Sequence, residues 1–184
     1  MAIVESWQIA EIAGPKKAAV ISRPEVIDAM ISRSKHPLMV VGHLAAEVHL
    51  DEKRMIDYLI ELGKTRDIPI IATGDTNREL LKRGYAEAAV MPAIDVGYRL
   101  TDPGWKGPDE RGPYDLAIFA GLPYAMEWTI LSGLKHFAPH VKTIALDGTY
   151  QPNASFSFAN ISTGELLRIL KAVIGHQEGK KNVQ

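Results

Sequence analysis

The sequence predicts an α/β domain with three layers, in which a doubly wound, mainly parallel sheet of six strands lies between two layers of helices. Short apolar runs recur along the chain, and they are continuous rather than alternating, as expected for strands that are buried on both faces. Helical patterns separate most of these runs. Alternation of strand and helix is typical of a parallel sheet whose connections cover both of its faces.

Each expected strand is a short apolar run bounded by glycine, proline or a helical pattern. Because both faces of such a strand would be covered by helices, no polar residue need interrupt it. In chain order the runs are LMVV (38–41), IPIIA (68–72), AAVM (88–91), DLAIFA (115–120), TIAL (143–146) and FSFA (156–159).

The expected helices each carry one apolar face, most clearly in residues 55–60 and 166–174. A glycine- and proline-rich stretch from Arg99 to Tyr114 is expected to form one long loop before the fourth main strand. Three helix starts fit the capping box, in which a hydroxyl and a carboxylate each bind a main-chain N–H group of the other residue. These are SRPE (22–25), TNRE (76–79) and STGE (162–165).

A chain of 184 residues with 46% hydrophobic composition is expected to fold as a single domain over residues 1–184. Within this domain, residues 1–20 are interpreted as an N-terminal arm and residues 175–184 as a polar tail. The chain contains no cysteine, which excludes disulfides, thiolate nucleophiles and the usual ligands of iron–sulfur clusters.

Charge and hydropathy exclude two classes of partner. The 21 Lys and Arg residues nearly balance the 22 Asp and Glu residues, which leaves no strong field to hold nucleic acid or an anionic membrane. No apolar run approaches the roughly 18 residues of a spanning helix, and residues 1–20 lack the apolar core of a signal peptide. The sequence therefore predicts a cytoplasmic protein that binds neither nucleic acid nor a membrane.

The candidate ligand site lies beyond the carboxyl ends of the strands, where open parallel sheets bind their ligands. Glycine there lets main-chain amides approach a phosphate, and an acidic side chain accepts hydrogen bonds from ribose hydroxyls. The same glycines also suit a purely steric role in tight turns, and neither GxGxxG nor GxxxxGK[ST] occurs. The residues at these strand ends are Gly42 and His43, then Thr73, Gly74 and Asp75, then Gly121, Leu122, Pro123 and Tyr124, and finally Asp147, Gly148 and Thr149.

Neither a metal site nor a catalytic group is expected. His43, Glu47 and His49 suggest a metal site, but they lack the HExxH spacing, and on a helix His49 would point away from the other two. They are better interpreted as polar turn residues. The chain has no cysteine nucleophile and no GxSxG elbow. Trp105 lies within the long loop, where a large aromatic residue suits either the core or a partner interface, and we interpret it as an interface residue.

Five parts of the chain carry a resemblance to a known family. They are "GPKKAAVISRPEVIDAMISRSKHPLMVVGHLA" (14–45), "PIIATGDT" (69–76), the loop around Trp105, "DLAIFAGLPYAMEWTILSGLKHF" (115–137) and "TIALDGTYQPNASFSFANIS" (143–162). Together they span nearly the whole chain. These segments resemble the epsilon subunit of the archaeal carbon monoxide dehydrogenase/acetyl-CoA decarbonylase/synthase (ACDS) complex.

The resemblance implies a fold similar to the deoxyhypusine-synthase-like (DHS-like) NAD/FAD-binding domain, which is Rossmann-like and also occurs in electron-transfer flavoproteins. It further implies a non-catalytic accessory subunit that joins the catalytic alpha subunit of CO dehydrogenase in an alpha-two epsilon-two unit of the larger complex. In that unit it would stabilise the alpha subunit and assist electron transfer to FAD.

The resemblance implies no tightly bound cofactor, with FAD as a transient ligand. The cofactor-binding residues that it implies are Gly42, His43, Thr73, Gly74, Gly121, Leu122, Asp147 and Gly148. In relatives that hold a dinucleotide, small residues follow the fourth strand, whereas Leu122, Pro123 and Tyr124 follow Gly121 here. This difference argues against tight retention. A free-standing FAD- or NAD-binding electron carrier remains the alternative, and the oligomeric state of the isolated chain, including a homo-oligomer, stays open.

Overall fold

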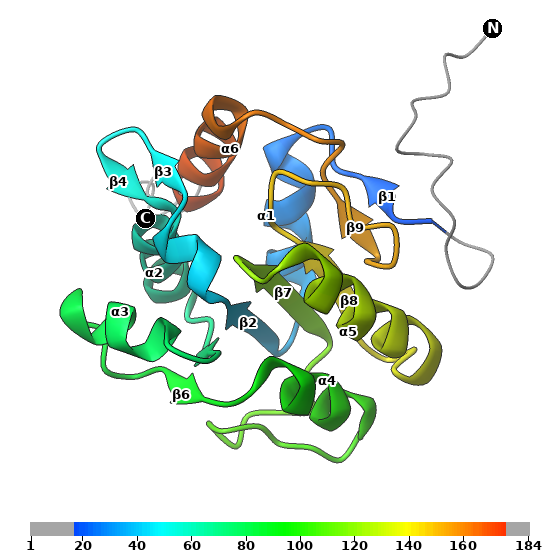
Figure 1. Cartoon of the computed structure of the whole chain (residues 1–184). Coiled ribbons are helices and arrows are strands. Elements are labelled where there is room, and N and C mark those ends of the chain that lie inside the picture. Colours follow the sequence, from blue (N-terminus) through cyan, green and yellow to red (C-terminus); the bar gives the residue numbers. More distant parts are fainter. Residues whose placement is uncertain (1–16, 176–184) are drawn as a thin grey trace, which may run out of the picture.

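A seven-stranded sheet, parallel throughout, forms the centre of the protein in a computed structural model that describes residues 17–175 (Figure 1). The strand order across the sheet is β1-β9-β8-β7-β2-β5-β6. Met39 in β2 pairs with Ile118 in β7 on one side and with Ile70 in β5 on the other. The strands are β1 (Ala19–Val20), β2 (Pro37–Val41), β5 (Ile70–Ala72), β6 (Ala89–Val90), β7 (Leu116–Ala120), β8 (Lys142–Ala145) and β9 (Phe156–Ser157).

Helices cover both faces of the sheet and make the three layers that the sequence predicts (Figure 1). From β2 the chain winds outward through β5 and β6, then returns to β7 and winds the other way through β8 and β9. The doubly wound prediction is therefore confirmed. Helices α1 (Pro24–Arg33), α2 (Met55–Arg66), α3 (Thr76–Lys82) and α6 (Thr163–Gly175) contribute to one apolar cluster, and α4 (Ala93–Thr101) and α5 (Tyr124–Phe137) contribute to the other.

The sheet has seven strands rather than the six predicted, because β1 adds an edge strand beside β9. Ala19 and Val20, which the sequence assigns to an N-terminal arm, form this strand, and Ala19 N donates to Ser155 O at 3.0 Å. A strand of two residues with exposed side chains has no apolar pattern to reveal it. The predicted polar tail begins at Gly175, where α6 ends, and its remaining residues lie outside the described part of the chain.

Two further segments differ from the prediction. Helix α4 continues to Thr101, so the loop expected from Arg99 begins after that residue. A short 3-10 helix, η2 (His43–Ala46), and an antiparallel pair, β3 (His49–Leu50) with β4 (Lys53–Arg54), precede α2. This pair is separate from the main sheet.

One of the three predicted capping boxes forms. Ser162 N donates to Glu165 Oε2 at 3.0 Å, and Glu165 N donates to Ser162 Oγ at 3.3 Å, as the STGE pattern predicts. The other two boxes are wrong. Helix α1 has Arg23 at its N-cap rather than Ser22, and Thr76 is already the first residue of α3.

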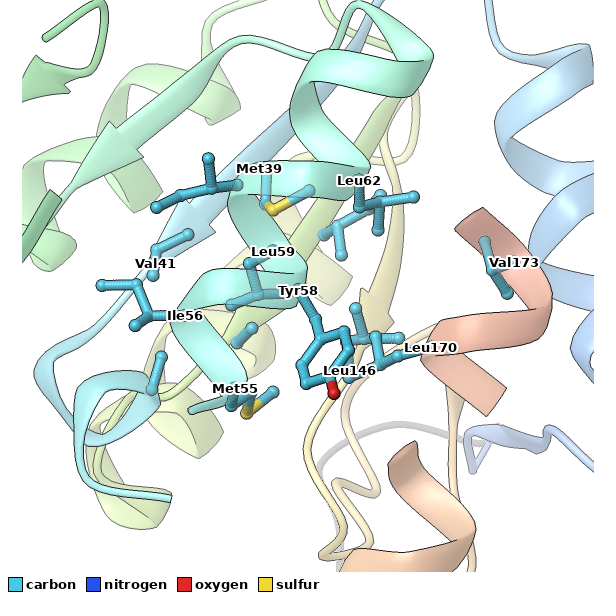
Figure 2. Close-up of a cluster of buried hydrophobic side chains, with 14 of the residues drawn as sticks. Met39, Val41, Met55, Ile56, Tyr58, Leu59, Leu62, Leu146, Leu170 and Val173 are labelled. Carbon is cyan, nitrogen blue, oxygen red and sulfur yellow. The ribbon is translucent and has the colours of Figure 1, made fainter. Parts of the chain in front are cut away.

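The side chains of β2 pack alternately against the two layers of helices. Met39 and Val41 point into the cluster that Figure 2 shows, where they pack near Leu59 and Leu62 of α2. The alternate residues of the strand, Leu38 and Val40, belong to the opposite cluster. Burial on both faces explains why the strand sequence shows no alternation of polar and apolar residues. Within residues 17–175, no helix has the length and apolar character needed to cross a membrane.

Replacement of Leu59 by alanine should lower the free energy of unfolding by about 3 kcal/mol, because the side chain is fully buried and its loss leaves a cavity. Urea denaturation measures this change. Leu81→Ala is the matched control, since Leu81 is also helical but 51% exposed, and its effect should stay below about 1 kcal/mol. Equal losses in the two variants would contradict the packing in Figure 2.

Candidate functional site

The candidate site is the point where the winding of the sheet reverses. Strands β2 and β7 are neighbours, and the chain leaves them toward opposite edges of the sheet (Figure 1). In an open α/β sheet such a switch point leaves a crevice beyond the carboxyl ends of the two strands. Gly42 follows β2 there, and Gly121 follows β7.

The two glycines pack directly against each other's turns. A Cβ atom on Gly42 would lie 2.2 Å from Gly121 O, and a Cβ atom on Gly121 would lie 2.4 Å from Ala45 N. Gly121 also has a φ of 71°, a left-handed conformation that favours glycine. Leu44 N donates to Gly121 O at 3.0 Å, which fastens the turns together. The close approach that glycine permits here is thus an approach of one main chain to another.

Asp147, which follows β8, is bound to the same turn. Its two carboxylate oxygens, Oδ1 and Oδ2, lie 2.9 and 3.1 Å from Gly121 N, which donates to them. The structure therefore brings together three of the predicted residues, Gly42, Gly121 and Asp147. The sequence predicts that an acidic side chain here accepts a hydrogen bond from a ribose hydroxyl. In the structure, the Asp147 carboxylate accepts one from the main chain at Gly121 instead.

A pair of carboxyl groups, the buried Glu127 and the partly buried Asp147, lies behind this turn. Glu127, in the first turn of α5, is 1% exposed. Burial, together with the neighbouring Asp147 carboxylate, raises the pKa of Glu127 well above its usual range. Burial also raises the pKa of Asp147 to about 6, although the Gly121 N–H group favours its ionised form. The neutral form of Glu127 is therefore favoured over its ionised form, relative to a glutamate in water.

Gln151 completes the buried group. Its Nε2 donates to Glu127 Oε2 at 3.3 Å and to Tyr124 O at 3.2 Å. Chemically, Glu127 is enclosed by protein atoms and its neutral form is favoured, which suits a structural role. A sequence signal for it exists, because Glu127 shares one face of α5 with Ile130, Leu131 and Leu134. An acidic residue on an apolar helix face indicates a buried charge or a buried proton.

Open space at this edge of the sheet lies to one side of the switch point, between η2 and α3. A cavity of about 480 Å³ lies there, and Thr76 at its wall is fully buried with an Oγ1 atom that has no hydrogen-bond partner among the described residues. Arg83 is paired with Asp57 and Glu79. Arg78, by contrast, is exposed and forms no ion pair within the described residues. The lining residues are His43, Ala46, Glu47, Arg54, Asp75, Thr76, Arg78, Glu79, Lys82 and Arg83.

Of the remaining predicted residues, His43 lines this cavity, and Gly74 is exposed in the turn before α3. Thr73 is directed inward, because both its N and Oγ1 donate to Val41 O, at 3.0 and 3.2 Å. Leu122 is 4% exposed and packs in the cluster beneath α5. Gly148 O accepts from Ile161 N at 2.8 Å, away from the cavity lining. The predicted residues therefore divide between an open rim and a closed interior.

The histidines considered as metal ligands lie on separate elements. His43 begins η2, Glu47 follows it, and His49 begins β3. Among residues 17–175, no group of three or more His, Cys, Asp or Glu side chains is arranged to hold a metal ion. His136 lies in the last turn of α5.

Trp105 is partly buried rather than free. Its ring centroid lies 5.6 Å from that of Tyr114 in an edge-to-face arrangement, and the side chain packs against the cluster beneath α4 and α5. Tyr114 in turn donates a hydrogen bond to Asp109, which is paired with Arg111. The loop thus has internal packing of its own, and the interface role of Trp105 stays a prediction.

The pair of carboxyl groups should make stability depend on pH. The folded protein keeps a proton on Glu127 that the unfolded chain has released, so stability should fall as the pH rises from about 4.5 toward the raised pKa of Glu127. Glu127→Gln removes this titration and keeps a donor for Asp147, so its thermal midpoint should fall less between roughly pH 5 and pH 8. Glu87→Gln, at an exposed site, should follow the wild-type profile. Parallel profiles for Glu127→Gln and wild type would contradict the raised pKa of Glu127.

Comparison with known proteins places this fold in a family. Residues 2–174 match the family described as "CO dehydrogenase beta subunit/acetyl-CoA synthase epsilon subunit". The chain is 38% identical over 165 residues to the acetyl-CoA decarbonylase/synthase complex subunit epsilon of Methanothermobacter thermautotrophicus, an alignment that covers 90% of this chain and 91% of the relative. It is also 38% identical over 157 residues to the subunit epsilon of Methanothrix soehngenii, with 85% and 81% covered.

A third relative, the subunit epsilon 1 of Archaeoglobus fulgidus, is 35% identical over 158 residues, with 85% of this chain and 82% of the relative covered. The family match and these identities extend over almost the whole chain. The chain therefore belongs to the family of epsilon subunits of the acetyl-CoA decarbonylase/synthase complex.

Proposed function

We propose that this protein is a non-catalytic accessory subunit of the CO dehydrogenase component of the complex, which stabilises the catalytic alpha subunit in an alpha-two epsilon-two unit. The single observation that carries the proposal is family membership over nearly the whole chain, with relatives named as epsilon subunits of that complex. The composition supports it, because a chain without cysteine lacks the usual ligands of an iron–sulfur cluster.

We further propose that the sheet is of the DHS-like, Rossmann-like type that binds NAD or FAD, and that FAD visits the rim of the switch point to receive electrons. The cavity between η2 and α3 supports this placement. Arg78 provides a positive charge for a diphosphate, and the Oγ1 of Thr76 provides a hydroxyl that has no partner within the described residues. FAD itself would supply the electron-accepting ring.

The closed contact between Gly42 and Gly121 supports weak rather than tight binding. A dinucleotide that enters a switch point normally lies between the two turns, whereas main-chain atoms fill that position here. FAD would then be restricted to the rim at His43, Thr76 and Arg78. This arrangement fits a transient ligand and no tightly bound cofactor.

The FAD proposal is tested in the reconstituted complex with two electron acceptors. Arg78→Gln should lower FAD affinity about tenfold, since one charge-assisted contact contributes roughly 1.5 kcal/mol. CO oxidation coupled to FAD should fall accordingly, while oxidation coupled to a small artificial acceptor that reaches the clusters directly should be unchanged. Gly121→Val is a poor probe, because the clash at Ala45 would disturb the fold before it affected a ligand.

Arg33→Gln is the matched control, because Arg33 is an exposed arginine at the end of α1 and should leave both rates unchanged. Equal loss with both acceptors in Arg78→Gln would indicate a damaged subunit interface. No loss with either acceptor would remove FAD from this rim. A stoichiometric flavin absorbance in the purified chain without the alpha subunit would instead favour a free-standing electron carrier.

Trp105→Ala should weaken association with the alpha subunit by about 2 kcal/mol, the usual loss on truncation of an aromatic interface residue. Trp105→Phe keeps a ring against Tyr114 and serves as the control for loop packing. Association is measured by titration of the alpha subunit, and thermal unfolding verifies that each variant is folded. Unchanged affinity in a folded Trp105→Ala variant would exclude Trp105 from the interface.

A further inference from the structure

A second cavity lies at the opposite end of the strands from the candidate site. It has a volume of about 550 Å³ and is lined by the first residues of three strands: Ala19 of β1, Lys142 of β8 and Phe156 of β9. Because the sheet is parallel, these residues mark its amino-terminal edge, whereas Gly42 and Gly121 lie at its carboxyl edge. A ligand in this cavity would therefore be separate from one at the switch point.

The walls of the cavity are joined by main-chain hydrogen bonds. Ala18 N donates to Pro152 O and Ala19 N donates to Ser155 O, each at 3.0 Å, so the segment that enters β1 is fixed to the segment that enters β9. Lys142 N donates to Asp115 O at 2.9 Å, which fixes the start of β8 beside β7. The cavity is therefore a preformed feature of the sheet edge.

The charged residues of the lining, within the described part of the chain, are basic. Lys17, Lys135, His136 and Lys142 line the cavity, and residues 17–175 contribute no Asp or Glu to it. Lys135 and His136 lie in the last turn of α5, where cations offset the partial negative charge of the helix end. Lys17 and Lys142 belong to other segments, so their charge is additional to that compensation. Burial lowers the pKa of Lys135, and an anion beside it would favour its charged form.

Two hydroxyl groups lie at the wall, and one of their two protons has no acceptor among the described residues. Ser155 N donates to Thr143 Oγ1 at 2.8 Å, and Thr143 N donates to Ser155 Oγ at 3.1 Å. The two hydroxyl oxygens lie 3.4 Å apart and share a single hydrogen bond. Whichever hydroxyl donates in that bond, the proton of the other has no acceptor among the described residues. The wall therefore offers a free O–H donor to an anion.

Asn153 provides a hydrogen-bond acceptor at the same cavity. It is 2% exposed and lines the cavity, and its Nδ2 lies 3.4 Å from Trp128 O, to which it donates. This bond fixes the orientation of the amide, because a carbonyl oxygen accepts only from the NH₂ side. Asn153 Oδ1 is left without a partner among the described residues. A buried acceptor of this kind needs a donor from a ligand or a water molecule.

We propose that this cavity binds a small organic phosphate whose non-phosphate part carries a hydrogen-bond donor. The phosphate would meet Lys17, Lys142 and the free hydroxyl proton, and an N–H or O–H group of the ligand would donate to Asn153 Oδ1. Leu134, Val141 and Phe156 provide apolar wall for the rest of the molecule. The lysines of the lining provide ammonium point charges, which are common ligands of phosphate.

The size of the cavity also favours an organic phosphate over the bare ion. About 550 Å³ lies within the usual range of small-molecule sites, roughly 300 to 1,000 Å³. AMP is a suitable probe, because it combines one phosphate with a flat ring and several donors. The site is independent of the FAD proposal, since none of its lining residues belongs to the cavity at the switch-point rim.

Calorimetric titration of the full chain with AMP tests the site. Lys142→Glu and Lys17→Glu, on different segments, should each weaken AMP at least about tenfold, while Lys106→Glu, an identical charge change at an exposed loop position, should stay within roughly twofold. Because Lys142 and Lys17 are both exposed, neither change should unfold the protein. No binding of AMP at millimolar concentration, or equal weakening in all three variants, would overturn the proposal.

Two further measurements distinguish AMP from inorganic phosphate and the amino-edge cavity from the switch-point rim. Asn153→Leu removes the buried acceptor and should weaken AMP severalfold while it leaves inorganic phosphate unchanged. If inorganic phosphate binds as tightly as AMP to the wild-type chain, the organic part makes no contact and the proposal fails. Arg78→Gln should leave AMP affinity unchanged. Loss of AMP binding in Arg78→Gln would place the nucleotide at the switch-point rim and overturn this site without affecting the FAD proposal.

Discussion

The contact between the turns after β2 and β7 is the constraint on which the rest of the candidate site depends. A Cβ atom on Gly42 would lie 2.2 Å from Gly121 O, so no other residue fits at Gly42 without movement of the main chain. The two central strands of the sheet are held in register by five residue pairs up to this contact. Their ends therefore meet as main chain against main chain.

That closure determines where polar groups and space can lie. Gly121 N donates to Asp147, and burial beside that carboxylate raises the pKa of Glu127 and favours its neutral form. Two ionised carboxylates that lie side by side with little access to water would repel each other strongly. At this edge of the sheet, the open space for a ligand lies at the rim, between η2 and α3, where the side chains are mainly charged.

The two edges of the sheet offer different chemistry. At the carboxyl edge, cations such as Arg83 are already neutralised by Asp57 and Glu79. At the amino edge, residues 17–175 contribute lysines but no carboxylate to the lining, and the buried amide oxygen of Asn153 has no partner among these residues. Recognition of a small molecule at the amino edge needs no metal ion, so a chain without cysteine can perform it.

The sequence by itself determined the layers, the doubly wound order and the family. Apolar runs such as 38–41 and 115–120 are local patterns, and a strand buried on both faces must show them wherever it is placed. The turn glycines and Asp147 followed from the same reasoning, because they come directly after such runs. The STGE box also formed, because its partners are three residues apart on one helix start.

Only the tertiary structure decided which groups these residues meet. The contact of Gly42 with Gly121, the pairing of Glu127 with Asp147 and the addition of β1 to the sheet each join segments far apart in the chain. Hydrophobic periodicity records which face of an element is buried, but not which main-chain atom lies opposite it. Those partners are set by the register of the strands and by the packing of α5 on the sheet, and both depend on the whole chain at once.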